Sequence, residues 1–286
     1  MNPCPACGAT EFIPLFEKNR LPICACRICS TAFVPDPPSP EAFKDYYSLD
    51  YFTGNHSKFG YIDYAAEEPF QAASFRHKAE RITRAMGGGR ILDVGCATSS
   101  FLMQLGPAWK KHGAEISQDL LKAYPPPPEV SMWTGDFLDY PENGEPFDVV
   151  TLWDVLDHVP NPKATLEKCW RLLRPGGMIA INVGDRGSLF ARCLGRRWHL
   201  YIPPTHLTFF NRSSLFQLLK NCRFTPQRWE YEGRWVPLSL CFFRLSYIIN
   251  RTFIRKLYEW SLRSALRNLS VYINLRDVVT VYAVKA

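Results

Sequence analysis

The sequence predicts an α/β fold built on a parallel sheet, and three observations support this prediction. Near-continuous apolar runs at residues 90–94, 147–153 and 178–183 are typical of strands that are covered on both faces. Segments between these runs carry apolar residues at helical spacing, as crossover helices do. A loop of small residues, 95–100, directly follows the first run, and the next helix is predicted to begin at Phe101. Alternating strands and helices of this kind indicate one α/β core over residues 90–183.

Composition sets the outer limits of the prediction. The chain has 286 residues, of which 47% are hydrophobic and 21% charged, which suits one globular domain with a small appendage. Its net charge of +7 favours anionic partners without choosing among nucleic acid, phosphorylated substrates and membrane surfaces. The start of the chain lacks a secretory pattern, and no apolar run reaches the ~18 residues of a membrane span. We therefore expect a cytoplasmic protein whose clustered cysteines bind metal rather than form disulfides.

The first region, 1–34, is predicted to be a zinc ribbon. It contains two C-x2-C pairs at a separation typical of four-cysteine zinc sites. Each pair can fold into a knuckle that offers two thiolates, so that two knuckles complete a tetrahedral Zn²⁺ site. The predicted ligands are Cys4, Cys7, Cys26 and Cys29. A closed site of this kind is structural, and direct contact of the ribbon with substrate is the alternative.

Three further segments complete the predicted architecture. The proline-rich linker 35–40 cannot be helical. Residues 41–89 are predicted to hold two N-terminal helices, at 41–47 and 70–86, the second of which ends at a run of three glycines. In the last region, 184–286, residues 238–269 are predicted to be a helical insertion with arginines on one side. We interpret this insertion as a lid or a dimer face, and contact with a membrane or a lipid-linked substrate is the alternative. Two short strands around residues 275–277 are expected to form a C-terminal antiparallel hairpin at one edge of the sheet.

An ordered series of motifs resembles a class I methyltransferase dependent on S-adenosylmethionine (SAM). The series begins with Asp93-Val-Gly95-Cys-Ala97-Thr-Ser99, continues with Glu115 and Asp136-Phe137, and ends with the strand 147–153 and Leu173-Arg-Pro-Gly-Gly177. The resemblance implies a Rossmann-like, seven-stranded methyltransferase sheet with SAM bound at the carboxyl ends of its strands. The domain is expected to span residues 41–286.

The same resemblance implies a role for each motif. The loop after the first strand approaches the methionine part of SAM, Glu115 accepts hydrogen bonds from the ribose hydroxyls, and Asp136 with Phe137 binds the adenine. The expected cofactor-binding residues are Asp93, Gly95, Ala97, Ser99, Glu115, Asp136, Phe137, Trp153 and Tyr61. The second and third glycines of the family pattern are replaced by Ala97 and Ser99. Loss of SAM binding is the alternative that these two replacements raise, and a plain core role is the alternative for Trp153.

Two histidines are candidates for general base catalysis. Residues 148–162 resemble the fourth-strand motif of small-molecule methyltransferases, with Asp157–His158 as the carboxylate–histidine pair that follows the strand. His206 lies in a segment that resembles one wall of the acceptor pocket. An imidazole suits this role because its ordinary pKa is near neutral. The alternatives are that His158 only bridges loops and that His206 caps the turn at Pro203-Pro204.

The predicted function is SAM-dependent methyl transfer to a small-molecule acceptor, namely a sugar, natural-product or envelope-glycan intermediate. The expected cofactors are SAM and one structural Zn²⁺ ion. An RNA base methyltransferase is one alternative, although the ribbon lacks the basic stripe with interleaved aromatics that RNA contact requires. A non-catalytic, methyltransferase-like binding protein is the other.

Overall fold

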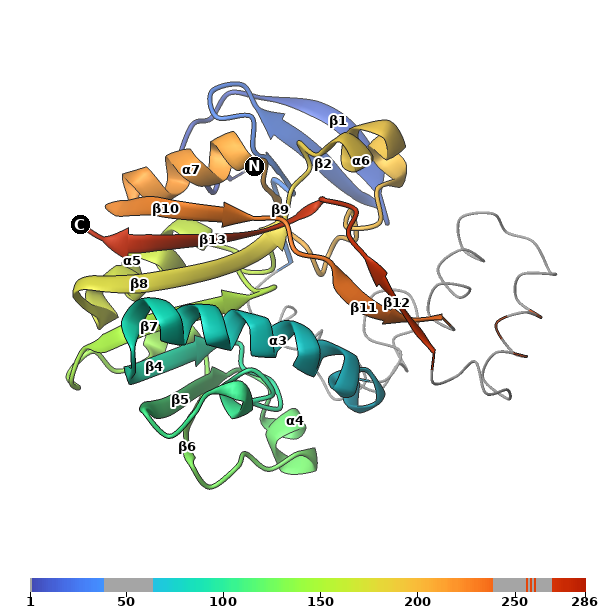
Figure 1. Cartoon of the computed structure of the whole chain (residues 1–286). Coiled ribbons are helices and arrows are strands. Elements are labelled where there is room, and N and C mark those ends of the chain that lie inside the picture. The colour runs from blue at the N-terminus through green and yellow to red at the C-terminus, as the bar shows by residue number, and fades with distance from the viewer. Residues whose placement is uncertain (1, 39–63, 239–255, 257, 259, 261–268) are drawn as a thin grey trace.

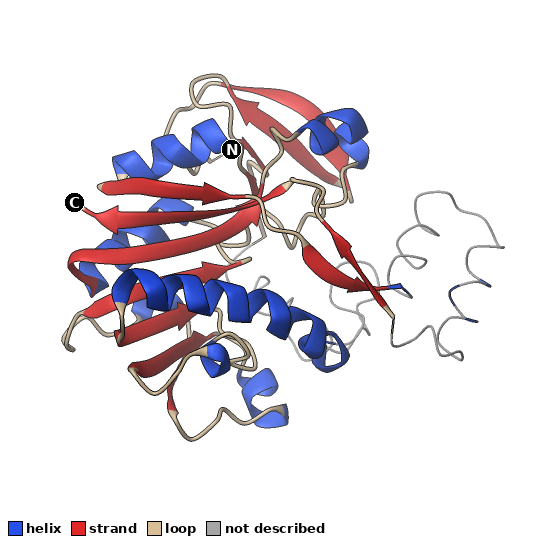
Figure 2. Cartoon of the chain, in the orientation of Figure 1, coloured by secondary structure: helices blue, strands red, loops and turns tan. Residues whose placement is uncertain are grey.

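The computed structural model describes residues 2–38, 64–238 and 269–286, together with Lys256, Tyr258 and Trp260 (Figure 1). The predicted helix at 41–47, Tyr61 and most of the predicted insertion at 238–269 lie outside the described residues. Within them, helices cover both faces of a central sheet, and a smaller sheet packs beside one of its edges (Figure 2). No helix in the described part of the chain has the length and hydropathy needed to cross a bilayer.

The central sheet has seven strands in the order β10-β13-β8-β7-β4-β5-β6. Its strands are β4 (Gly89–Val94), β5 (Trp109–Glu115), β6 (Val130–Thr134), β7 (Phe147–Trp153), β8 (Leu173–Gly184), β10 (Phe224–Glu230) and β13 (Val278–Lys285). The strands from β8 to β6 run parallel to one another, whereas β13 is antiparallel to both of its neighbours. The predicted seven-stranded Rossmann-like sheet is thereby confirmed.

Side chains of β4 alternate between two hydrophobic cores, because successive residues of a strand point to opposite faces. Leu92 and Val94 pack on the side of α5 (Pro162–Leu172) and α7 (Arg212–Asn221). Ile91 packs on the side of α3 (Tyr64–Met86). The sheet is therefore buried on both faces, as its apolar strands predict.

Local signals set the ends of these helices. Asn161 caps α5, where its side chain accepts from the backbone N–H of Ala164, and Pro162 occupies the first helical position. A reciprocal capping box between Asn211 and Ser214 opens α7. Helix α3 ends at Met86, where Gly87 takes a left-handed φ of 80°, as the glycine run predicts. The short elements that remain are α4 (Gln118–Ala123), α6 (Leu189–Leu194) and the 3₁₀ turns η1 (Leu102–Gln104), η2 (Phe137–Asp139) and η3 (Gly195–Arg197).

The predicted C-terminal hairpin is wrong. Strand β12 (Ser270–Ile273) pairs with β11 (Arg234–Pro237), and this two-stranded sheet projects beyond the central sheet (Figure 1). Strand β13 instead lies between β8 and β10. The physical reason is burial: the middle of β13, residues 279–283, is buried throughout, and a strand of that kind needs a neighbour on each side.

The helix predicted to begin at Phe101 is also wrong, because only the single turn η1 forms there. Pro107 lacks a backbone N–H and disfavours a helical conformation in the preceding Gly106. Phe101 and Leu102 are buried nonetheless, and they cover the sheet beside α3. The connection from β4 to β5, residues 95–108, consequently holds the single 3₁₀ turn η1 in place of a crossover helix.

The cysteine-rich region forms part of a second sheet. We call residues 2–34 the ribbon; its strands are β1 (Phe12–Lys18), β2 (Leu21–Cys26) and β3 (Ala32–Phe33). The fourth strand of this sheet, β9 (Thr208–Phe209), comes from the distant second half of the chain. Ile23 and Val34 of the ribbon share a core with residues such as Trp198. The ribbon is thus joined to the larger fold by both a sheet and a core.

Candidate active site

The loop after β4 keeps the backbone of a glycine-rich loop although two glycines are absent. Gly95, Ala97 and Ser99 have φ values of +67°, +46° and +66°. A side chain at Gly95 would place its Cβ 2.7 Å from a methyl carbon of Val155, so this position requires glycine. Ala97 and Ser99 adopt the left-handed region that side chains disfavour. The loop therefore holds its shape against a conformational cost.

Glu115 helps to hold that shape. It ends β5, and its buried carboxylate accepts hydrogen bonds from the backbone N–H of Ala97 at 3.0 Å and of Ser117 at 2.9 Å. Burial raises the pKa of Glu115, while the backbone donors act in the opposite direction. A carboxylate has about four lone-pair sites, so acceptor capacity remains after these two bonds.

Asp93 lies beneath the loop, where it ties two strands together. The hydroxyl of Thr151 in β7 donates to its carboxylate at 2.6 Å. Burial raises the pKa of Asp93 to about 8, and the bond from Thr151 acts in the opposite direction. The structure thus places Asp93 below the loop as a buried tie between β4 and β7.

Trp153 ends β7 on the side that faces α3. Its indole N–H is buried and has no hydrogen-bond partner among the described residues. The ring of Phe101 lies 5.0 Å from it, centroid to centroid, and the Lys78 ammonium lies 4.5 Å from its ring centroid. Only 6% of Lys78 is exposed, so a cation sits against the end of β7. An N–H of this kind is available to a ligand.

Lys78 was not among the predicted site residues, although the sequence holds a signal for it. It lies on the buried stripe of α3 that Phe75, Ala79 and Ile82 form at helical spacing. A cation within an apolar stripe is rarely buried without a partner, so its position marks a polar site beneath the helix.

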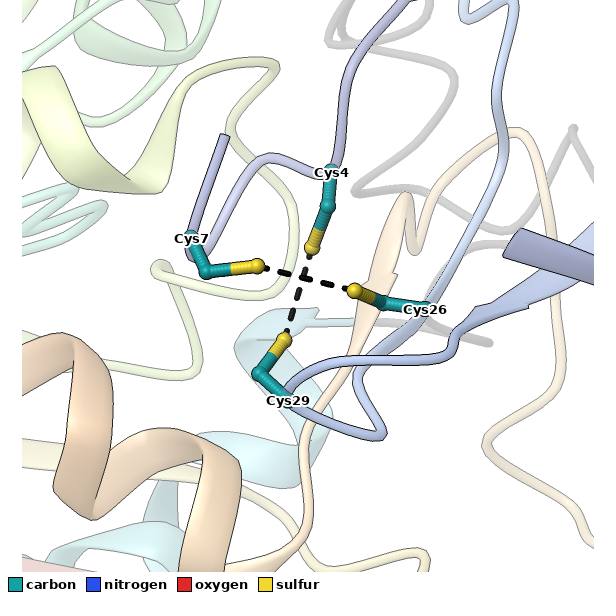
Figure 3. Close-up of side chains that lie close together, drawn as sticks. All are labelled: Cys4, Cys7, Cys26 and Cys29. Atoms are coloured by element: carbon teal, nitrogen blue, oxygen red, sulfur yellow. Dashed lines mark hydrogen bonds between the residues drawn. The ribbon is translucent and has the colours of Figure 1, made fainter. Parts of the chain in front are cut away.

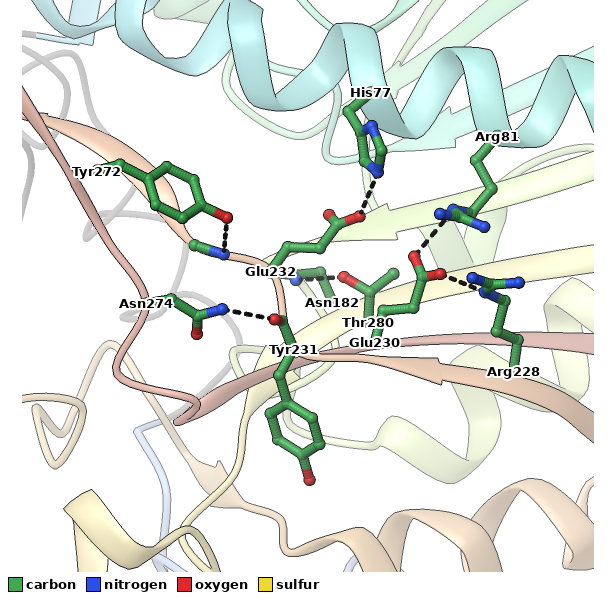
Figure 4. Close-up of polar contacts among 11 residues, drawn as sticks. His77, Arg81, Asn182, Arg228, Glu230, Tyr231, Glu232, Tyr272, Asn274 and Thr280 are labelled. Carbon is green, nitrogen blue, oxygen red and sulfur yellow. Dashed lines mark hydrogen bonds and ion pairs between the residues drawn. The ribbon is translucent and has the colours of Figure 1, made fainter.

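Ion pairs fasten α3 to the end of β10 beside this site (Figure 4). Arg81 contacts Glu230 at 2.9 Å, and His77 contacts Glu232 at 3.3 Å. Burial raises the pKa of Glu232, while Lys78 and His77 act in the opposite direction. The helix that carries Lys78 is therefore held in place by charged contacts as well as by its apolar stripe.

Asp136 and Phe137 follow β6 at the same edge of the sheet. The side chain of Asp136 caps η2, where it accepts from the backbone N–H of Leu138 at 3.0 Å. The ring of Phe137 lies 6.2 Å from that of Tyr140. Because β4 to β7 are parallel, their carboxyl ends place the loop, Glu115, Asp136 and Trp153 along one edge. Of the predicted cofactor set, only Tyr61 lies outside the described residues.

Asp157, His158 and His206 form one cluster beyond the end of β7. Asp157 Oδ1 lies 3.9 Å from His158 Nε2, and Asp157 Oδ2 lies 3.6 Å from His206 Nδ1. The two imidazole centroids are 4.3 Å apart. Tertiary structure thus brings both predicted histidines to one carboxylate. Asp157 Oδ1 and the hydroxyl of Thr208 are buried with no hydrogen-bond partner among the described residues.

Burial sets the protonation state of this cluster. The pKa values of His158 and His206 are both lowered to about 4, chiefly by burial, and the nearby imidazole of His206 contributes to the shift of His158. Burial raises the pKa of Asp157 to about 6, against the effect of His158. At neutral pH the carboxylate is ionised and both imidazoles are neutral, which is the state that a general base requires.

A second buried network, which the sequence analysis missed, lies past the end of β8. Tyr231 donates from its hydroxyl to Asp185 at 2.7 Å, and the Trp198 indole donates to Asp277 at 2.8 Å. Burial and the bond to Asp185 raise the pKa of Tyr231 to about 12. These four residues come from four separate segments, so no local pattern in the sequence marks them.

The four predicted metal ligands meet in the ribbon (Figure 3). The Sγ atoms of Cys4 and Cys29, and those of Cys7 and Cys26, lie 3.5 Å apart, and all four fall within 4.8 Å of one another. A Zn–S bond of ~2.3 Å gives a tetrahedral S–S edge of about 3.8 Å. The thiol set therefore fits a four-coordinate zinc ion, with no position left for a substrate.

Comparison with known proteins identifies the family. Residues 63–226, more than half of the chain, match the family described as a methyltransferase domain. The chain belongs to this family. Among solved structures, the methyltransferase resembles magnesium protoporphyrin IX methyltransferase from Synechocystis, which was solved with bound S-adenosylhomocysteine (SAH). The TM-score is 0.53 at 15% identity, over 86% of this chain and 99% of that one, and this likeness concerns the fold.

Relatives of known name match part of the methyltransferase. The ubiquinone biosynthesis O-methyltransferase of Vibrio atlanticus is 29% identical over 160 residues, which cover 49% of this chain and 64% of that protein. The demethylmenaquinone methyltransferase of Lysinibacillus sphaericus is 28% identical over 135 residues, which cover 44% and 58% respectively. Both alignments span less than two thirds of the relative.

Proposed function

We propose that this methyltransferase binds SAM along the carboxyl ends of β4 to β7 and transfers its methyl group to a hydroxyl of a small-molecule acceptor. The observation that carries the proposal is a juxtaposition. The glycine-type loop, Glu115 and the Trp153 N–H, which has no partner in the described part of the chain, lie on the same edge of the sheet as the Asp157–His158–His206 cluster.

Different residues of this edge suit the ribose, the adenine and the methionine part of SAM. Glu115 keeps acceptor capacity for ribose hydroxyls, and Asp136 with Phe137 follows the next strand, where the adenine is expected. The Lys78 ammonium and the Trp153 N–H supply a cation and a donor for the carboxylate end of the methionine part. Once bound, SAM supplies the methyl group on its sulfonium.

The protein contributes a general base and a site from which water is excluded to the methyl transfer. A neutral imidazole of His206 or His158 takes the proton of the acceptor hydroxyl as that oxygen attacks in line, and the Asp157 carboxylate stabilises the resulting imidazolium. Burial of the cluster excludes water and strengthens these interactions. Positioning of acceptor and methyl group accounts for most of the remaining rate.

The names of two relatives support a proposal for the acceptor class. These names refer to ubiquinone and menaquinone synthesis, one of them as an O-methyltransferase. We therefore propose a hydroxyl on an aromatic ring of quinone-precursor type. The sugar and glycan acceptors expected from the sequence form the second candidate. The structural zinc of the ribbon is proposed on the thiol geometry alone.

Calorimetric titration with SAH tests the cofactor site. We expect micromolar binding by the wild-type protein and its loss in Glu115→Ala and Asp93→Ala. Glu129→Ala, at an exposed position before β6, is the matched control and should bind normally. Failure of the folded wild-type protein to bind SAH or SAM would favour the non-catalytic alternative.

Transfer of label from methyl-tritiated SAM tests the acceptor. A catechol-bearing benzoate, a nucleotide sugar and bulk RNA should be offered in parallel, with His206→Gln as the control for the proposed base. Label in the catechol, reduced at least ~100-fold by the substitution, is the expected result. Label in the sugar would move the proposal to the second candidate, and label in RNA would overturn it.

A further inference from the structure

The short strand β9 connects the ribbon to the proposed acceptor side. On one side it pairs with β3, in the register Ala32 with Phe209 and Phe33 with Thr208. The backbone N–H of Val34 extends this pairing to the carbonyl of Leu207 at 2.9 Å. Residue 206 directly precedes this segment, so the ribbon contacts the chain next to His206.

The same segment is bonded to Asp157. The carbonyl of Asp157 accepts from the N–H of Leu207 at 2.9 Å and from that of Thr208 at 3.1 Å. Residues 207–209 are thus bonded to the ribbon through the Leu207 carbonyl and the pairing of β9 with β3. The N–H groups of residues 207 and 208 are bonded to the loop that carries Asp157. The distance between His206 and Asp157 depends on both attachments.

Other ribbon contacts hold the chain just before His206. The Asn19 side chain donates to the carbonyl of Pro203 at 2.8 Å, and the ring of Phe16 lies 5.0 Å from that of Tyr201. Ile23 and Val34 pack with Tyr201 in one core. The ribbon therefore forms a continuous support behind residues 201–209.

The support depends on the cysteine knuckles. Strand β3 has two residues, and a strand so short cannot keep its place unaided. Its start is set by the second knuckle, because the N–H of Cys26 donates to the carbonyl of Thr31 at 2.9 Å and Cys29 Sγ lies 3.1 Å from the Thr31 hydroxyl. The four thiols come from two separate loops, so an ion bound among them would join these loops.

We propose that the metal-filled ribbon is a positioning element for the acceptor side: the bound ion fixes β3, β3 fixes β9, and β9 places His206 against Asp157. This inference rests on the proposed function for its catalytic meaning. The cofactor side stands on other elements, since Glu115 and the loop after β4 bond to each other and Trp153 packs against α3. Emptying the ribbon is therefore expected to disturb His206 and to leave the cofactor site intact.

The test follows zinc content, SAH affinity and the His206 imidazole in the same samples. Zinc is removed from the whole protein with a chelator and then restored, and Cys26→Ser with Cys29→Ser gives a second route to the empty ribbon. Cys193→Ser, at an exposed cysteine outside the set, is the matched control. The pKa of His206, followed by NMR of histidine-labelled protein, reports its burial without need of an acceptor.

We expect the zinc-free protein to bind SAH within about twofold of the wild-type affinity. The pKa of His206 should rise from about 4 toward its ordinary value of about 6.5, because His206 loses its buried place, and zinc should reverse the rise. An unchanged His206 pKa in zinc-free, folded protein would overturn the inference, as would loss of SAH binding together with the His206 shift. Absence of SAH binding in zinc-replete wild type would instead count against the proposed function. The pKa of His206 would still decide whether the ribbon positions that residue.

A variant that keeps all four thiols tests the effect of a ribbon contact on His206 without loss of the metal. Asn19 has a φ of 51°, so Asn19→Gly suits the backbone while it removes the donor to Pro203. Arg20→Gly, at the neighbouring φ of 64°, makes the same backbone change at an exposed side chain and serves as its control. Retained zinc with a raised His206 pKa in the first variant alone is expected. Equal behaviour of the two variants would contradict the proposed support.

Discussion

At the scale of single residues, Ala97 and Ser99 show that a glycine-type loop can survive the loss of two glycines. Both residues keep a left-handed φ, and both are enclosed by the fold. The bond from Ala97 to Glu115 and the packing of Ser99 compensate for the conformational cost. The replacements therefore change the stability of the loop more than its shape.

Restoring the glycines is expected to stabilise the protein. Because the left-handed region costs a residue with a side chain about 1 kcal/mol, Ala97→Gly and Ser99→Gly should each raise the free energy of unfolding by up to about 1 kcal/mol. Urea denaturation measures the change. Thr98→Gly, at a position without positive φ, should lower stability instead, and equal effects at positions 97, 98 and 99 would contradict the argument.

The buried cluster predicts how stability depends on pH. Below pH 6.5 the unfolded chain protonates both histidines, whereas in the native protein the pKa values of His158 and His206 are about 4. The native pKa of Asp157, about 6, lies above its ordinary value of 3.8, so the native cluster takes up one proton there. Between about pH 6 and 4 the unfolded state thus holds about one more proton than the native state, and stability falls as pH falls, by about 1 kcal/mol per pH unit.

Denaturation at several pH values tests this dependence. In His206→Gln the unfolded state binds one proton fewer, so it holds about as many protons as the native state between pH 6 and 4. The contribution of this cluster to the pH dependence of the free energy of unfolding should then be nearly zero. Ser213→Ala, at an exposed position of α7, changes no titratable group, so it is the control and should keep the wild-type slope. A steeper slope in His206→Gln would show that the sign is wrong.

At the scale of elements, the ion pairs between α3 and β10 hold the helix over the end of the sheet. A double-mutant cycle with Arg81→Met and Glu230→Gln should give a coupling energy of about 1 kcal/mol or more, because both side chains are largely buried. The pair of Lys163 and Glu167 on α5 is about half exposed at 3.8 Å and should give less than about 0.5 kcal/mol. Equal couplings in the two cycles would show that burial does not strengthen the α3 contact.

Element pairing also shows where local sequence pattern stops being informative. The strands β4, β7 and β8 could be predicted because their apolar runs are local features of the sequence. The partners of β12 and β13 could not, since both segments alternate in much the same way and pairing depends on which neighbours are left to bury each strand. The helix expected at Phe101 failed because a proline six residues later outweighed local apolar spacing.

At the scale of the whole molecule, the ribbon joins the first residues of the chain to residues 201–209, which lie far from them in the sequence. Metal analysis should find one zinc per chain, and chelation should lower the midpoint of thermal unfolding by several degrees, because an ion that binds only the folded site stabilises it. Cys4→Ser should reproduce the shift, and Cys193→Ser should not. A folded protein that contains no zinc, with an unchanged midpoint after chelation, would contradict the metal assignment.

The sheet edge that carries Glu115, the cluster of Asp157 with the two histidines, and the ribbon differ in how far they follow from the order of residues. Motifs spaced along parallel strands must meet at one edge, so the positions of the loop, Glu115 and Asp136 follow from strand direction alone. The C-x2-C pairs likewise predict their own convergence, because each knuckle is a local turn. These features depend on strand direction and on local turns, which the amino-acid sequence specifies directly.

Other features depend on long-range packing. Asp157 and His206 are far apart in the chain and meet because β9 is bonded on both sides, and Lys78 is buried because α3 lies across the end of β7. Burial also sets the proton affinities of the cluster, since removal from water disfavours the charged forms. A sequence can place a histidine near a strand end, but the depth at which it is buried and the carboxylate it faces are set by all the segments that close around it.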